Sequence, residues 1–159
     1  REALVGAASA LGIDAVEGNA ELLETLRIEA GIPALGTELD EDVLPPEARL
    51  ERAIAINKGC YVGQEIVARL RSRGQVNHLL VGLRFEGDAL PAAATPLTVA
   101  GRAIGEVTSS VVSPTEGPIG LGYVRREQAE DGTLLDAAGA RARVSTLPFV
   151  ARSPEARSS

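Results

Sequence analysis

Several residue types are rare or absent in this chain of 159 residues, and each shortage excludes a class of protein. Aromatic residues make up 3% of the sequence, and methionine and tryptophan are missing, so any core must be built from aliphatic side chains. A single cysteine cannot form a disulfide within the chain. The sequence also has a single histidine, so one cysteine and one histidine cannot form a four-ligand zinc site without carboxylates. We therefore expect no metal site. Because no methionine occurs, we also expect that the chain lacks its own initiator.

Basic residues and long apolar runs are scarce as well. Sixteen Lys and Arg against 22 Asp and Glu give a net charge of −6. This balance argues against a general nucleic-acid or membrane-surface binder, because both need clustered positive charge. No apolar stretch approaches the roughly 18 residues that span a bilayer, and no signal-peptide pattern opens the sequence. One free cysteine is compatible with a reducing compartment, so we expect a cytoplasmic protein.

The residues that are present change character near residue 75. Before this point, apolar positions and capping residues predict helices over residues 2–11, 19–30, 47–53 and 64–73, with a short strand over 13–16. Asn19 is suited to cap the second helix, and Gly31 is suited to end it. A loop over 32–46 follows this second helix. Its acidic run, Glu38 to Asp42, lacks the ligand spacing of a calcium loop and is predicted to be solvated.

After residue 75, short stretches rich in β-forming residues alternate with turn residues such as Ala100-Gly101 and Ala138-Gly139. Spacing of this kind predicts a small antiparallel barrel or sandwich. We therefore expect an α+β fold, with a mixed α/β segment over residues 1–74, an all-β module over 75–150 and a flexible tail over 151–159. The predicted strands cover residues 76–85, 97–99, 103–112, 119–124 and 142–147.

The single cysteine, Cys60, admits two interpretations. Free cysteines are often buried structural residues. Here, however, Lys58 and the positive end of the helix predicted from Gln64 both favour the thiolate, which is the form needed for nucleophilic or redox chemistry. His78 has no protease-like context, so we do not expect it to act as the base for this thiol. The local chemistry leaves a structural and a reactive cysteine both open.

Two further features have a plain and a functional interpretation. Glu29, near the end of the second helix, can be a solvated residue, or its two oxygens can bind an aminopyrimidinone ring with two adjacent N–H donors. A basic patch is either exposed helix surface or a docking site for an anionic group; it comprises Arg69, Arg71 and Arg73. The spacing of these residues does not decide between the alternatives.

Residues 58–65, KGCYVGQE, resemble the K-G-C-[FY]-x-G-Q-E signature of YgfZ-type folate-binding proteins. These proteins are relatives of the glycine-cleavage T-protein, an aminomethyltransferase, and of a mitochondrial factor for iron–sulfur cluster assembly. Residues 26–33 are similar to the R-x-E-A-G-x-P segment that T-proteins share. Residues 105–109, 113–114, 120–124 and 147–149 resemble the C-terminal barrel of the same family. The resemblance thus extends over nearly the whole chain.

This resemblance implies part of a mixed α/β domain that binds tetrahydrofolate, followed by a small Greek-key-like antiparallel barrel, with the family's N-terminal half missing from this chain. It implies a role in assembly or repair of iron–sulfur clusters in client proteins, including enzymes that modify tRNA. Cys60 and Lys58 would form the functional pair. The implied cofactor-binding residues are Glu29, Arg27, Tyr61 and Gln64.

Two other functions stay open beside this one. T-proteins do not carry a cysteine at the position of Cys60, yet a folate-dependent aminomethyltransferase of the glycine-cleavage type is the enzyme alternative. A non-catalytic barrel that docks a partner through residues 69–73 is the third. Whether the chain is an enzyme is therefore not decided by its sequence.

Overall fold

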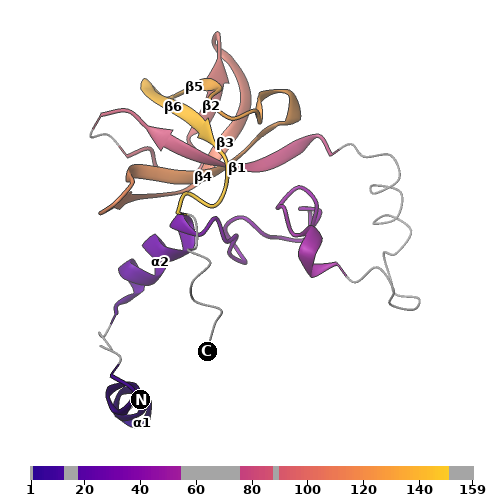
Figure 1. Cartoon of the computed structure of the whole chain (residues 1–159). Coiled ribbons are helices and arrows are strands. Elements are labelled where there is room, and N and C mark those ends of the chain that lie inside the picture. The colour runs from indigo at the N-terminus through magenta and orange to yellow at the C-terminus, as the bar shows by residue number, and fades with distance from the viewer. Residues whose placement is uncertain (1, 13–17, 55–75, 88–89, 151–159) are drawn as a thin grey trace, which may run out of the picture.

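The computed structural model describes residues 2–12, 18–54, 76–87 and 90–150 (Figure 1). Two α-helices come first, α1 (Glu2–Ala10) and α2 (Ala20–Glu29), followed by a short 3-10 helix, η1 (Glu51–Ala53). A second 3-10 helix, η2 (Arg126–Gln128), lies between two of the strands. The strands of the described residues are β1 (His78–Phe85), β2 (Pro96–Val99), β3 (Arg102–Ser113), β4 (Gly117–Arg125), β5 (Leu134–Ala137) and β6 (Ala140–Ser145).

The six strands form a closed antiparallel barrel in the order β1-β4-β3-β2-β5-β6. This confirms the all-β module and selects the barrel over the sandwich. Five of the strands lie where the sequence predicts them. The predicted turns are present as well, and their residues are left-handed: Ala100 and Gly101 (φ 50° and 77°) before β3, and Ala138 and Gly139 (φ 53° and 92°) before β6. The mixed α/β segment over residues 1–74 stays a prediction.

Two elements differ from the sequence prediction. Strand β5 was not expected, because its four residues contain no β-branched or aromatic side chain. The helix expected over 47–53 is instead a set of turns followed by η1. Arg49 adopts a left-handed conformation (φ 57°), and a residue in that conformation ends a right-handed helical turn. The strand expected over 13–16, the helix expected over 64–73 and the tail lie outside the described residues.

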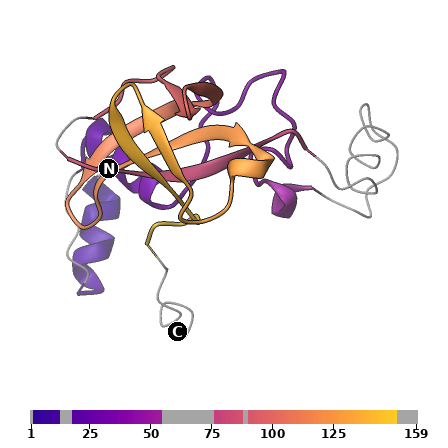
Figure 2. The same cartoon turned by 90° about the horizontal axis from the view of Figure 1, so that it is seen from above.

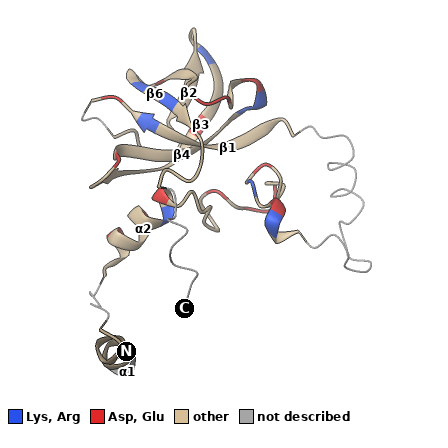
Figure 3. Ribbon diagram, in the orientation of Figure 1, with Lys and Arg blue, Asp and Glu red and all other residues tan. Residues whose placement is uncertain are grey.

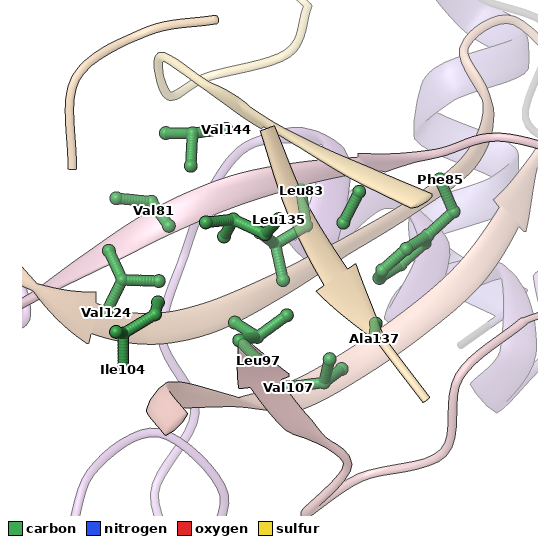
Figure 4. Packing of buried hydrophobic residues seen from close by; sticks show 11 residues of the cluster. Val81, Leu83, Phe85, Leu97, Ile104, Val107, Val124, Leu135, Ala137 and Val144 are labelled. Carbon is green, nitrogen blue, oxygen red and sulfur yellow. The ribbon is translucent and has the colours of Figure 1, made fainter. Parts of the chain in front are cut away.

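The barrel interior is filled by apolar side chains that come from all six strands (Figure 4). Strand β1 shows the alternation most clearly, since Val81, Leu83 and Phe85 all point into this cluster. Gly105 lets β3 approach β4 closely, because a Cβ atom there would lie 1.9 Å from the carbonyl oxygen of Tyr123. The aliphatic core expected from the composition is confirmed apart from Phe85, the one aromatic side chain of this cluster.

Helix α2 packs against the outside of the barrel, where it contacts β3 and β4 (Figures 1 and 2). Its predicted ends are confirmed: the Oδ1 atom of Asn19 accepts a hydrogen bond from the Leu22 backbone N–H at 2.8 Å, and Gly31 has a left-handed φ of 64°. Ile28 is its fully buried apolar residue, in a cluster with Leu80 and Ile119. Helical spacing also places three leucines on one face of α2, but all three are exposed in this structure, namely Leu22, Leu23 and Leu26.

Helix α1 lies where the sequence predicts it and is followed by Gly12 with a φ of 70°. None of the helices in the described ranges is long and apolar enough to cross a membrane.

Candidate functional site

Part of the predicted site lies outside the described residues. These residues are Lys58, Cys60, Tyr61 and Gln64. Their roles stay predictions, as does the basic patch over 69–73. The predicted residues that the structure does place are Glu29 and Arg27, both in the last turn of α2, where charged residues of both signs meet the barrel (Figure 3).

Glu29 is held at the end of α2 by contacts with two distant segments. The hydroxyl of Ser113 donates a hydrogen bond to Oε1 of Glu29 at 2.5 Å. The oxygen of that hydroxyl accepts from the backbone N–H groups of Thr115 and Glu116, so its proton is free to point at the carboxylate. The carbonyl oxygen of Glu29 accepts from the Phe149 N–H at 2.9 Å. Both the side chain and the backbone of Glu29 are thereby positioned.

The second carboxylate oxygen of Glu29, Oε2, accepts no hydrogen bond from any residue that the structure describes. An ionised carboxylate has about four acceptor sites, of which Ser113 occupies one. The side chain is neither fully buried nor fully exposed. Glu29 is therefore an anchored carboxylate with acceptor capacity left for a ligand.

Arg27, unlike Glu29, has no hydrogen-bonding capacity left for a ligand, because all five N–H donors of its guanidinium have protein acceptors. Nε and Nη2 donate to the two carboxylate oxygens of Glu24, at 2.8 and 2.5 Å. Nη1 donates to the carbonyl oxygen of Ile32 and to Glu38, and Nη2 also donates to the hydroxyl of Ser109. A ligand contact by Arg27 would have to replace one of these bonds, and its role in cofactor binding stays a prediction.

Glu38 is the largest departure from the sequence prediction in this region. The loop was expected to be solvated, but this expectation is wrong for Glu38, whose side chain is 0% exposed. Its Oε1 accepts from the hydroxyls of Thr108 (2.9 Å) and Ser109, and its Oε2 accepts from Arg27 and from the Ala34 N–H, both at 2.9 Å. Four donors thus satisfy the buried charge, which would otherwise be costly to remove from water. Asp40, Glu41 and Asp42 are exposed, as predicted.

Electrostatics stabilise the charged form of this network. The hydrogen bond to Glu24, with the nearby charge of Glu38, raises the pKa of Arg27 above its usual value, against the opposing effect of burial. The same bond from Arg27 lowers the pKa of Glu24. Burial, together with the negative charges of Glu38, Glu47 and Asp40, raises the pKa of Tyr123, whose hydroxyl donates to the Glu38 carbonyl oxygen at 2.9 Å. Tyr123 therefore stays a neutral donor over the physiological pH range.

The only histidine of the sequence, His78, is exposed and lines a cavity of about 370 Å³ together with acidic residues. The acidic residues of this cavity are Asp40, Asp42, Glu47 and Glu106. Within the described part of the chain, no three His, Cys, Asp or Glu side chains are arranged to hold a metal ion.

The barrel has recognisable relatives. Residues 79–150 match the glycine cleavage T-protein C-terminal barrel domain. The barrel is therefore similar to the C-terminal barrel of T-proteins. Over 138 residues, the chain is 40% identical to an aminomethyltransferase of Streptomyces avermitilis, a match that covers 81% of this chain and 37% of that protein. It is also 36% identical over 143 residues to a putative chloroplastic transferase of Arabidopsis thaliana, with 86% of this chain and 32% of that protein covered.

A solved structure agrees with these sequence relatives. The glycine cleavage system aminomethyltransferase T from Bartonella henselae superposes with a TM-score of 0.71 at 29% identity, covering 80% of this chain and 37% of that one. The chain thus spans about a third of the length of the relatives it matches. The predicted relationship to T-protein aminomethyltransferases is confirmed at this level, and the more specific YgfZ-type assignment stays a prediction.

Proposed function

We propose that this chain is part of a tetrahydrofolate-binding protein of the aminomethyltransferase type, and that Glu29 contacts the pterin ring of the folate. The observation that carries the proposal is the anchored carboxylate of Glu29, with Oε1 fixed by Ser113 at 2.5 Å and Oε2 without a partner among the described residues. The aminomethyltransferase relatives support it, because the family resemblance implies folate as the cofactor.

The chemistry of the two groups is complementary. The pterin ring presents a ring N–H and an exocyclic amine side by side, and a carboxylate accepts two such parallel hydrogen bonds. Fixing the carboxylate in advance reduces the conformational entropy that the ligand must overcome on binding. The remaining contacts that we propose for the folate come from Tyr61 and Gln64. A contact from Arg27 would need one of its five present hydrogen bonds to be exchanged for the ligand.

For the activity of the whole protein, we propose maintenance of iron–sulfur proteins in the cytoplasm, with Cys60 as the reactive group and Lys58 as the cation that favours its thiolate. The support is the complete match of residues 58–65 to the YgfZ-type signature. Aminomethyl transfer in glycine cleavage is the second candidate, and the relatives named aminomethyltransferase favour it.

Folate binding is tested by replacing Glu29 with Gln in the intact protein that contains this sequence. The amide keeps the shape of the side chain but places an NH₂ donor where the pterin donors need an acceptor. We therefore expect the Kd for 5-formyltetrahydrofolate to rise about tenfold or more. Glu21→Gln is the matched control, because Glu21 lies exposed in the first turn of the same helix. Equal affinity of the Glu29→Gln variant and the wild type in calorimetric titration would refute the proposed contact.

The two activities are separated by Cys60→Ala in cells. Loss of iron–sulfur enzyme activity with intact glycine oxidation supports the maintenance role, whereas the reverse pattern supports aminomethyl transfer. Because Cys60 is the only cysteine of the 159 residues, the reaction of this chain with a thiol reagent across pH reports Cys60 directly. An apparent pKa at the ordinary value of about 8.5 would argue against an activated thiolate.

A further inference from the structure

Strand β3 contains an irregularity directly opposite the buried Glu38. Val107 pairs with Gly122 and Ser109 pairs with Leu121 on β4, so Thr108 is an extra residue in the ladder, a β-bulge. In a regular strand, the neighbours Thr108 and Ser109 would point to opposite faces. Here both hydroxyls donate to the same oxygen, Oε1 of Glu38. The bulge is what allows two consecutive residues to bind one carboxylate.

The same carboxylate is bound to α2 through its other oxygen. Oε2 of Glu38 accepts from Arg27 in the last turn of α2, and Arg27 also donates to Ser109 at 2.8 Å. Arg27 and Glu38 therefore connect the helix, the loop after it and the bulge of β3. We call this group of four residues the clamp: Arg27, Glu38, Thr108 and Ser109.

Two members of the clamp lie close in sequence to the Glu29–Ser113 pair. Arg27 lies two residues before Glu29 in α2, and Ser109 lies four residues before Ser113 in β3. Between Ser109 and Ser113 the β3–β4 register is regular, so these two serines are separated by about 13 Å along the strand. The end of α2 is thus attached to β3 at two separated points, by Arg27 to Ser109 and by Glu29 to Ser113. Two separated attachments fix the direction of the helix end as well as its position.

We propose that Glu38 and the bulge residue Thr108 are positioning residues for Glu29, which set its carboxylate at the orientation that the folate ring requires. This inference rests on the proposed folate contact of Glu29. Glu38 cannot itself serve the ligand, because its side chain is buried and four donors occupy its acceptor sites. Its effect on binding is exerted through Arg27 and the last turn of α2.

The test uses variants of graded severity in the intact protein. Thr108→Val removes one hydroxyl and keeps the shape of the side chain, whereas Thr108→Ser keeps the hydroxyl. Glu38→Gln removes the charge opposite Arg27. We expect the Kd for 5-formyltetrahydrofolate to rise about tenfold for Glu38→Gln and about threefold for Thr108→Val, with wild-type affinity for Thr108→Ser.

The variant Val144→Ala tests whether Glu38 positions Glu29 or only stabilises the fold. Val144 is buried in the barrel interior, in a cluster that includes no residue of α2 and no member of the clamp, so we expect this variant to lower the melting temperature without moving α2. We expect it to bind the folate as the wild type does at temperatures where it is folded. If Val144→Ala and Glu38→Gln lose affinity in proportion to their loss of melting temperature, or if Glu38→Gln binds as tightly as the wild type, the positioning role is overturned.

Amide hydrogen exchange separates this inference from the proposed function. We expect the backbone amides of Ala30 and Gly31 to exchange at least about tenfold faster in Glu38→Gln than in the wild type, with barrel amides unchanged. If the wild type fails to bind the folate but exchange accelerates in this way, the folate contact is wrong and the positioning of α2 stands. If exchange at these amides is unchanged, the clamp does not position the helix end.

Discussion

The barrel interior and the junction between α2 and the barrel are built from different interactions. Apolar side chains from all six strands meet in the interior, and their attraction depends little on direction. At the junction, α2 contributes one fully buried apolar residue, Ile28, and its last turn is held by hydrogen bonds and ion pairs around Arg27 and Glu38. Hydrogen bonds weaken steeply with angle, so they specify one geometry. The interior therefore stabilises the fold, while the junction orients the candidate site.

The largest effect is expected from breaking the barrel at Gly105. In Gly105→Ala the new methyl group would lie 1.9 Å from the carbonyl oxygen of Tyr123, so the β3–β4 ladder must shift. We expect unfolding in urea to show a loss of about 3 kcal/mol or more. Gly6→Ala is the control, because a Cβ at Gly6 in α1 meets no atom within 4 Å. Wild-type stability of Gly105→Ala would mean that the strands are not packed as closely as described.

A smaller and more local effect is expected at Ile28. Ile28→Ala removes the apolar anchor of α2 and should cost about 2 kcal/mol, measured by urea unfolding of the 159-residue chain. Amides of α2 should exchange faster, while barrel amides keep their protection. Leu23→Ala on the same helix should change stability by less than about 0.5 kcal/mol, because Leu23 is 69% exposed. Equal acceleration of barrel amides would show that interior and junction unfold as one unit.

Tyr123 connects the two regions, and its replacement should change the response to alkaline pH. Its pKa in the folded protein lies above the ordinary 10.0, so the folded state holds the proton more tightly than the unfolded state. Wild-type stability should then decline as pH rises above 10.0. Tyr123→Phe should lose about 1 kcal/mol at pH 7, through the bond to the Glu38 carbonyl, but should lack this part of the alkaline decline. If the urea midpoints of the wild type and of Tyr123→Phe fall in parallel from pH 9 upward, this expectation is contradicted.

The smallest effect is expected at Glu24, the exposed end of the junction. Its pKa is lowered by the hydrogen bond from Arg27, so its contribution is present at neutral pH and is lost as pH falls from about 4.5 through the folded-state value. Because the side chain is 47% exposed, solvent screens the pair, and Glu24→Gln should cost less than about 0.5 kcal/mol at pH 7. The difference from the wild type should shrink as pH falls below about 4.5 in urea unfolding; a difference that does not change with pH would exclude the ion pair as its source.

Much of the barrel could be predicted from the sequence because strand alternation and turn chemistry are local properties. Val81, Leu83 and Phe85 alternate along β1 and point inward, and Ala138-Gly139 adopts the positive φ values that its turn requires. Strand β5 could not be predicted in this way, because its residues have weak β propensity and the strand forms by pairing with β2 and β6.

The candidate site was only partly predictable for a related reason. Glu29 could be selected from its position at the end of a helix and from the resemblance, but its partner Ser113 lies 84 residues away. Glu38 and Glu41 look alike in the sequence, but Glu38 is buried against donors of β3 and α2 while Glu41 is exposed. Likewise, helical spacing groups the leucines of α2 on one face without showing which face is covered.

The sequence by itself determined the aliphatic core, the ends of α2, the all-β class of the C-terminal module and the presence of a lone cysteine between two glycines, because each depends on composition or on neighbours in the chain. Only the tertiary structure decided that Glu38 is buried, that Thr108 forms a bulge and that one oxygen of Glu29 is anchored while the other has no partner among the described residues. Those features depend on groups brought together from distant parts of the chain, and no local pattern encodes them.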